Sequence, residues 1–164
     1  MTITEAESSA YIENAIKRIE SGRIQAGSYI VGVFGKSAGL YETIMRSKLR
    51  STLGALALEY DRTIRPQIKG NPAFHKLSLG MVAFSWKMLN EPSLDYLRRG
   101  IPSTTERVAF LKQLQAVNDT WVGVKHEGLE ISGTEAVKHL KMMVSSLNTV
   151  GQIRARLAAK GRAN

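Results

Sequence analysis

A long run of helical periodicity in the first half of the chain most constrains the fold. From Gly39 to Arg65, apolar side chains recur every three or four residues, so they fall on one face of an α-helix. Pro66 ends this pattern, because its ring clashes with the preceding helical turn. We therefore predict one long helix over residues 39–65. Its packing face comprises Tyr41, Met45, Leu49, Thr52, Leu53, Leu56, Tyr60 and Ile64.

Three other helices are indicated by the residues at their starts. In a capping box, a Ser or Thr side chain accepts a hydrogen bond from the amide of a Glu three residues later. The pattern occurs three times, at intervals that suit separate helices. It therefore predicts three helix starts, at Thr4 with Glu7, Ser103 with Glu106, and Ser132 with Glu135.

Two further segments differ in how clearly they can be interpreted. Asn71 and Pro72 suit the cap and first turn of a helix over Pro72–Leu89 that is apolar on nearly every side, so we expect a buried core helix. The apolar run at residues 28–34 fits either a buried strand or a helix, and periodicity does not separate them at this length. Helix or irregular structure is favoured, because no second strand is available to pair with it.

These patterns predict an all-α, compact single domain of five to six helices over residues 1–164. The chain has 164 residues, 43% of them hydrophobic, which suffices for one core. Cysteine is absent, so disulfides and thiolate metal sites are excluded and a reducing compartment is suited. The start, Met1–Ala10, lacks the basic and apolar regions of a signal peptide, and no run reaches the length of a membrane span. We expect a cytoplasmic protein.

The net charge of +9 predicts attraction to a polyanion. The charge is uneven, because Met1–Gly35 sums to −1 whereas Lys36–Gly70 and Leu129–Asn164 each sum to +4. Residues 152–164 form a basic C-terminal tail, expected either as a flexible arm or as a charged helix end. The leading hypothesis is a non-enzymatic protein that binds nucleic acid through phosphate contacts, or that joins a nucleoprotein or virion-like assembly. The predicted contact residues are Lys36, Arg46, Arg50, Arg65, Arg154, Arg156, Lys160 and Arg162.

A second hypothesis has no nucleic-acid role. In it the chain is a protein-binding subunit or adaptor, for instance of a viral or mobile-element assembly, that forms a stable homo-oligomer. The basic surface would then serve solubility alone.

Two local motifs point weakly to other functions. Gly35-Lys36-Ser37 echoes a phosphate-binding loop, but Ile30 stands where that loop needs glycine, so a glycine-rich turn into a helix is favoured. Ser93–Gln115 has the outline of a helix-turn-helix with a polar helix start, although a plain helical hairpin fits its residues better. The three histidines show no metal-ligand spacing, and no cofactor is predicted.

One resemblance gives a third functional hypothesis. Ile19-Glu20-Ser21-Gly22, followed by Lys36-Ser37-Ala38-Gly39-Leu40-Tyr41, resembles fragments of phage lysozymes and lytic transglycosylases. In that family a Glu-Ser pair ends the first helix, and the Glu is the catalytic acid. The resemblance implies a peptidoglycan hydrolase in which Glu20 protonates the glycosidic oxygen, a role that needs a low-polarity cleft. Glu42 stands where the family has Gln.

Overall fold

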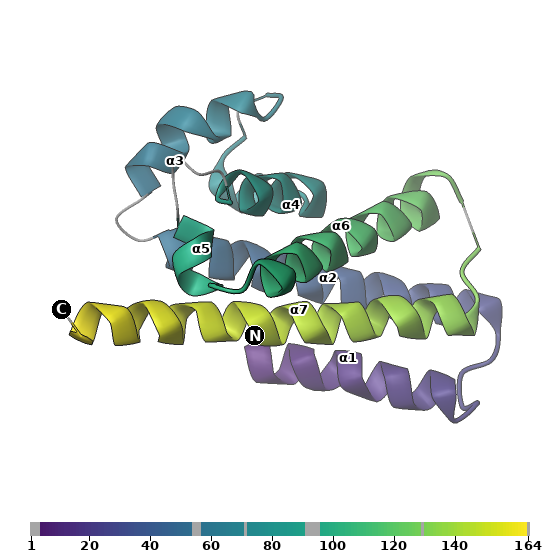
Figure 1. Cartoon of the computed structure of the whole chain (residues 1–164). Helices are drawn as coiled ribbons and strands as arrows, with labels where there is room; N and C mark the ends of the chain where they lie inside the picture. The colour runs from purple at the N-terminus through teal and green to yellow at the C-terminus, as the bar shows by residue number, and fades with distance from the viewer. Residues whose placement is uncertain (1–3, 54–56, 71, 91–95, 129, 164) are drawn as a thin grey trace.

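The protein is an all-α bundle, as predicted, arranged around one long helix (Figure 1). The computed structural model describes residues 4–53, 57–70, 72–90, 96–128 and 130–163, and these contain seven α-helices and no strand. None of these helices is long and apolar enough to cross a bilayer. The helices are α1 (Glu5–Glu20), α2 (Gly27–Leu53), α3 (Ala57–Thr63), α4 (Leu79–Met88), α5 (Tyr96–Gly100), α6 (Thr104–His126) and α7 (Gly133–Ala163), with 3₁₀ turns η2 (Arg65–Gln67) and η3 (Phe74–Lys76).

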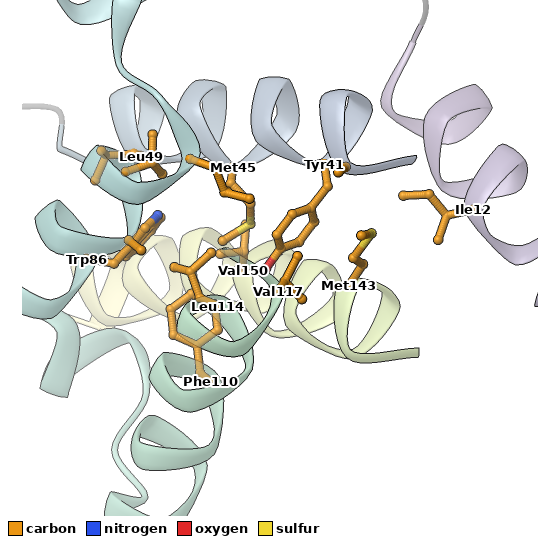
Figure 2. Close-up of a cluster of buried hydrophobic side chains, with 14 of the residues drawn as sticks. Ile12, Tyr41, Met45, Leu49, Trp86, Phe110, Leu114, Val117, Met143 and Val150 are labelled. Atoms are coloured by element: carbon orange, nitrogen blue, oxygen red, sulfur yellow. The ribbon is translucent and has the colours of Figure 1, made fainter. Parts of the chain in front are cut away.

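Helix α7 is the centre of the bundle. It packs against α1, α2 and α6, which lie along its length (Figure 1). Its apolar face is fully buried at Leu140, Met143 and Val150, which belong to one continuous core. Met143 and Val150 lie beside core side chains of α2 and α6 (Figure 2). The helix includes residues 152–163, so the predicted basic tail continues α7 as a charged helix end.

Helix α2 begins twelve residues earlier than predicted, at Gly27 rather than Gly39. The run at residues 28–34, which fits either a strand or a helix, is helical, as the sequence analysis favoured. Ile30, Phe34 and Tyr41 are buried on one face of α2. Packing against α7 outweighs the low helix propensity of the glycines in this stretch.

The predicted single helix over residues 39–65 is described as two helices. Helix α2 ends at Leu53 and α3 covers Ala57–Thr63, and the three residues between them lie outside the described part of the chain. The predicted packing face is confirmed where side chains are described, since each of these is at most 2% exposed. These are Tyr41, Met45, Leu49, Tyr60 and Ile64, whereas the side chains of Thr52, Leu53 and Leu56 lie outside the description.

The predicted core helix at residues 72–89 is buried, but it starts seven residues later than expected. Ser78, not Asn71, caps it, because the Ser78 hydroxyl accepts from the Met81 amide at 3.4 Å. Asn71 lies outside the described residues, and Pro72 precedes η3. Trp86 of α4 is fully buried and meets Phe110 of α6 edge to face at 5.5 Å between ring centroids.

All three predicted capping boxes begin helices. The amide of each box's Glu donates to the Ser or Thr hydroxyl that precedes it by three residues, which satisfies one of the free amides of the helix start. The distances are 3.1 Å for Glu7 to Thr4, 3.3 Å for Glu106 to Ser103 and 3.1 Å for Glu135 to Ser132.

The molecule thus has two regions of different construction. The long-helix region consists of α1, α2, α6 and α7, and the short-helix region consists of residues 57–100, with α3, α4, α5 and both 3₁₀ turns. Each region contains a buried tyrosine–serine pair. Tyr41 meets Ser146 at 2.7 Å between α2 and α7, and Tyr60 meets Ser85 at 2.9 Å between α3 and α4.

Candidate polyanion-binding surface

The net positive charge of the protein is confined to two segments. Residues 46–99 carry ten Lys and Arg against four Asp and Glu, and residues 152–164 carry four Lys and Arg with no acid. The remainder of the chain carries nine basic and ten acidic residues. These two segments, which we call the basic end, therefore hold all of the surplus charge.

The fold brings the two basic segments to the same end of the molecule, where α3, α5 and the C-terminus of α7 lie (Figure 1). Gly100 of α5 packs against Ile153 of α7, so closely that a Cβ at residue 100 would lie 2.6 Å from Ile153 Cγ2. Arg156 adds a hydrogen bond from its Nη1 to the Gly100 carbonyl at 3.2 Å. Segments about fifty residues apart in sequence are thus held together by direct packing.

Arg46 is occupied by contacts within the protein. Its Nη1 donates to Glu42 Oε1 at 3.3 Å and to the Leu77 carbonyl at 3.0 Å. The other oxygen of Glu42 accepts from the Leu79 amide at 3.1 Å, at the first residue of α4. Glu42 and Arg46 therefore fix the start of α4 on α2, which is a structural role.

Two more of the predicted contact residues are paired with carboxylates. Arg65 Nη1 lies 3.3 Å from Asp61 Oδ1, and Arg156 Nη1 lies 3.5 Å from Glu106 Oε1. The two guanidinium groups are about one-third exposed, so each reaches both a carboxylate and solvent. Such pairs contribute little stability, but they neutralise part of the field at the basic end.

Arg50 and Lys36 are exposed, but they lie far apart. Arg50 lies over the Phe74 ring at 5.9 Å, within the basic end. Lys36 contacts the Tyr11 ring of α1 at 4.5 Å, and it lies about 20 Å from Arg50 along α2 at 1.5 Å per residue. Of the predicted contact residues with described side chains, Arg46, Arg50, Arg65 and Arg156 therefore belong to the basic end, and Lys36 does not. The side chains of Arg154, Lys160 and Arg162 lie outside the description, although their backbone belongs to α7.

Several exposed cations at the basic end, among them Lys69, Lys76 and Arg98, were missed by the sequence prediction. Lys69, Lys76 and Arg98 are exposed, and no carboxylate among the described residues pairs with them. The charge sums gave the signal, since Lys36–Gly70, which contains Lys69, sums to +4, and Asn71–Gly100 carries four basic against two acidic residues. The residue type and sequence position of a cation do not show whether the fold will pair it with a carboxylate.

The helix-turn-helix and phosphate-loop interpretations find no matching geometry among the described residues. Helix α5 has five residues, and Arg107 near the start of α6 is buried, with Nη1 donating to the Ile101 and Pro102 carbonyls at 2.7 and 2.9 Å. The expected turn at Gly35 is wrong, because Gly35-Lys36-Ser37 lies inside α2. Ser37 is buried and donates to the Val33 carbonyl at 2.8 Å.

Glu20 lies in an open groove of about 770 Å³ between α1 and α7. Its carboxylate is half-exposed and lies 3.6 Å from the Lys141 ammonium. Glu13 and Lys17 line the same groove beside the apolar Ile16. A glycosidase acid needs apolar surroundings that keep its carboxyl protonated, and this polar, solvated setting does not supply them. The hydrolase hypothesis stays a prediction without geometric support.

The histidines are separate from one another. His75 and His126 are exposed, whereas His139 is buried and hydrogen-bonds Thr120 through Nε2 at 2.8 Å and the Glu135 carbonyl through Nδ1 at 2.8 Å. The described part of the chain contains no group of three His, Asp or Glu side chains arranged to hold a metal.

No protein family, curated protein or solved structure compared with this chain matches it. The function proposed below therefore rests on charge and geometry.

Proposed function

We propose that the protein binds nucleic acid without catalysis, through phosphate contacts at the basic end. The single observation that carries this proposal is the packing of Gly100 on Ile153, which joins the two basic segments at one end of the bundle. All of the surplus charge is concentrated there, and a concentrated positive field attracts a polyanion more strongly than scattered charge of the same sum.

The contacts fall to the cations that remain free. Arg50, Lys69, Lys76 and Arg98 are exposed and have no carboxylate partner among the described residues, so no described ion pair has to break when they meet a phosphate. Arg46, Arg65 and Arg156 chiefly hold the surface together. Arg154, Lys160 and Arg162, whose backbone belongs to α7, are further proposed phosphate contacts.

Binding measured across a salt series tests the proposal. Each phosphate contact on duplex DNA releases counterions, so the logarithm of the affinity falls with the logarithm of salt concentration by a slope of about 0.9 per contact. The double variant Lys69→Gln/Lys76→Gln should weaken binding and reduce the slope by about two. A single-stranded RNA and a duplex DNA of equal length, measured in parallel, would identify the preferred nucleic acid.

The matched control is Lys17→Gln/Lys138→Gln, which removes the same charge from exposed positions on α1 and α7. This variant should leave the slope almost unchanged. No binding at low salt, a flat salt response, or an equal loss in both double variants would contradict the proposal.

A further inference from the structure

Helix α6 exposes an apolar and charged stripe on the face turned away from the bundle. Val108 and Val122 are 43% and 38% exposed, which places them among the most exposed large hydrophobic residues described. Lys112, Gln115 and Asp119 are exposed on the same helical face, since they lie one, two and three turns after Val108. The opposite face of α6 packs on α7, α4 and α2.

The order of residues along this stripe is complementary to itself when reversed. About a centre at Gln115, Val108 lies as far in one direction as Val122 in the other, and Lys112 and Asp119 are nearly equidistant with opposite charges. A two-fold axis through this centre places Val108 of one copy against Val122 of the other. It likewise places Lys112 of one copy against Asp119 of the other. We propose that the outer face of α6 binds a second copy of this chain, with the two α6 helices antiparallel.

Charge selects this orientation. In a parallel pair, Lys112 would face Lys112 of the second copy and Asp119 would face Asp119, and both contacts are repulsive. In the antiparallel pair both contacts are attractive, and the interface is isologous, as the two-fold symmetry of most homodimers requires. Within the described part of the chain Lys112 has no carboxylate partner, and Asp119 accepts only from Gln115 at 2.8 Å.

One pair of helices buries less area than the roughly 1,200 Å² of a stable interface, so the dimer belongs to the weak, concentration-dependent class. This inference does not rest on nucleic-acid binding. The basic end lies toward the start of α6 (Figure 1). In the antiparallel dimer, the basic ends of the two copies would therefore lie at opposite ends of the assembly.

Charge reversal tests the interface by sedimentation equilibrium, from about 5 to 500 µM protein. The parent protein should dimerise. Lys112→Asp and Asp119→Lys should each weaken the dimer at least about tenfold, because each leaves two like-charged contacts, and the double variant should regain the parent affinity to within about threefold. The control Lys138→Asp reverses an exposed charge on α7 and should have no effect. A parent protein that stays monomeric throughout, or a double variant that does not recover, overturns the proposal.

Cysteine cross-linking provides a second test that does not depend on reversed charges. The chain has no cysteine, so single introduced thiols report alone. Gln115→Cys should form a disulfide-linked dimer rapidly, since only a residue at the axis meets its own copy within about 7 Å. Val108→Cys and Val122→Cys should cross-link when mixed more readily than either does alone. Equal cross-linking of Gln115→Cys and Lys138→Cys overturns the antiparallel interface.

Discussion

The long-helix and short-helix regions differ in how they are stabilised. Helices α1, α2 and α6 pack along most of α7, and this region buries Tyr41 against Ser146 in its centre. In the short-helix region, α3 contacts mainly η2 and α2, whereas α4 and α5 depend on α6, α2 and α7. The short helices are therefore held by docking onto the long ones, with few contacts among themselves.

The surplus charge is shared between the two regions at one end of the molecule. Residues 46–99 and 152–164 hold a surplus of ten positive charges, and the remainder of the chain is one charge short of neutral. The short-helix region carries seven basic against four acidic residues, whereas residues 46–53 of α2 and 152–163 of α7 carry seven basic residues and no acid. Concentrated like charge destabilises a compact state, and here most of it lies at the ends of the two best-packed helices. The basic end therefore combines the short-helix region with these two helix ends, and the remainder of the long-helix region is the scaffold. The predictions below test that separation.

Trp86→Ala should have the largest effect, because it removes the fully buried anchor of α4 on α6. We expect a loss of about 3–5 kcal/mol in the free energy of unfolding, measured by chemical denaturation. Trp121→Ala, at a half-buried residue of the long-helix region that lies 6.2 Å from Phe34 between ring centroids, should cost less.

Hydrogen exchange on Trp86→Ala shows whether the two regions are separable. Amides of α3 and α4 should exchange much faster than in the parent, while those in the middle of α2 and α7 remain protected, because the docked region opens first. Equal acceleration in both regions would show that the bundle is one cooperative unit, and the comparison would then lose its physical basis.

Gly100→Ala should loosen the joint between the two basic segments. The new Cβ would lie 2.6 Å from Ile153 Cγ2, and relieving that overlap should cost about 1–3 kcal/mol in thermal or chemical unfolding. In an Ile153→Ala background the same substitution should cost much less, because the clashing atom is gone. Gly151→Ala, which has open space around it, should instead stabilise α7 by about 1 kcal/mol.

Tyr41→Phe and Tyr60→Phe, which remove a buried hydroxyl, should each lower the free energy of unfolding by about 1 kcal/mol, because Ser146 or Ser85 then loses its hydrogen-bond partner.

The two sites should differ in how pH affects stability. Burial raises the pKa of Tyr41 far above its usual value, although the Ser146 hydrogen bond opposes the rise. Burial raises the pKa of Tyr60 less, with the Ser85 hydrogen bond opposing, Asp61 adding to the rise and Arg65 lowering it.

Each tyrosine has a higher pKa in the folded protein than in the unfolded chain, so its contribution to stability is complete below about pH 10. Above that pH the contribution is lost, because the unfolded chain ionises first. The free energy of unfolding should therefore decline above about pH 10, and Tyr41→Phe should flatten this decline more than Tyr60→Phe. Equal slopes for both variants would remove this distinction between the regions.

The sequence was sufficient for the helices whose signals are local. Each capping box needs two residues three positions apart, and all three mark helix starts as predicted. The start of α2 was placed too late, because glycines at residues 27, 32 and 35 lower helix propensity, whereas burial of Phe34 against other helices decides the structure. That burial depends on partners distant in sequence.

The basic end was only partly predictable, because its charge can be summed from the sequence whereas its ion pairs depend on the fold. Charge sums identify the segments, but they do not show which cations the fold will pair. Arg46 pairs with Glu42 four residues before it, a spacing visible in sequence, yet its bond to the Leu77 carbonyl depends on the position of α4. Conversely, among the described residues no carboxylate pairs with Lys69 or Lys76, which only the fold determines.

Glu20→Gln should have the smallest effect on stability, and it tests which region carries the function. The Glu20–Lys141 pair joins α1 to α7 at 3.6 Å, but both side chains are at least half exposed, so its loss should cost about 0.5 kcal/mol or less. Nucleic-acid binding should stay at the parent level, because Glu20 on α1 lies outside the basic end. If the parent protein clears purified peptidoglycan and Glu20→Gln does not, the groove is catalytic. The long helices would then carry the chemistry, and the basic end would at most guide the protein to an anionic cell wall.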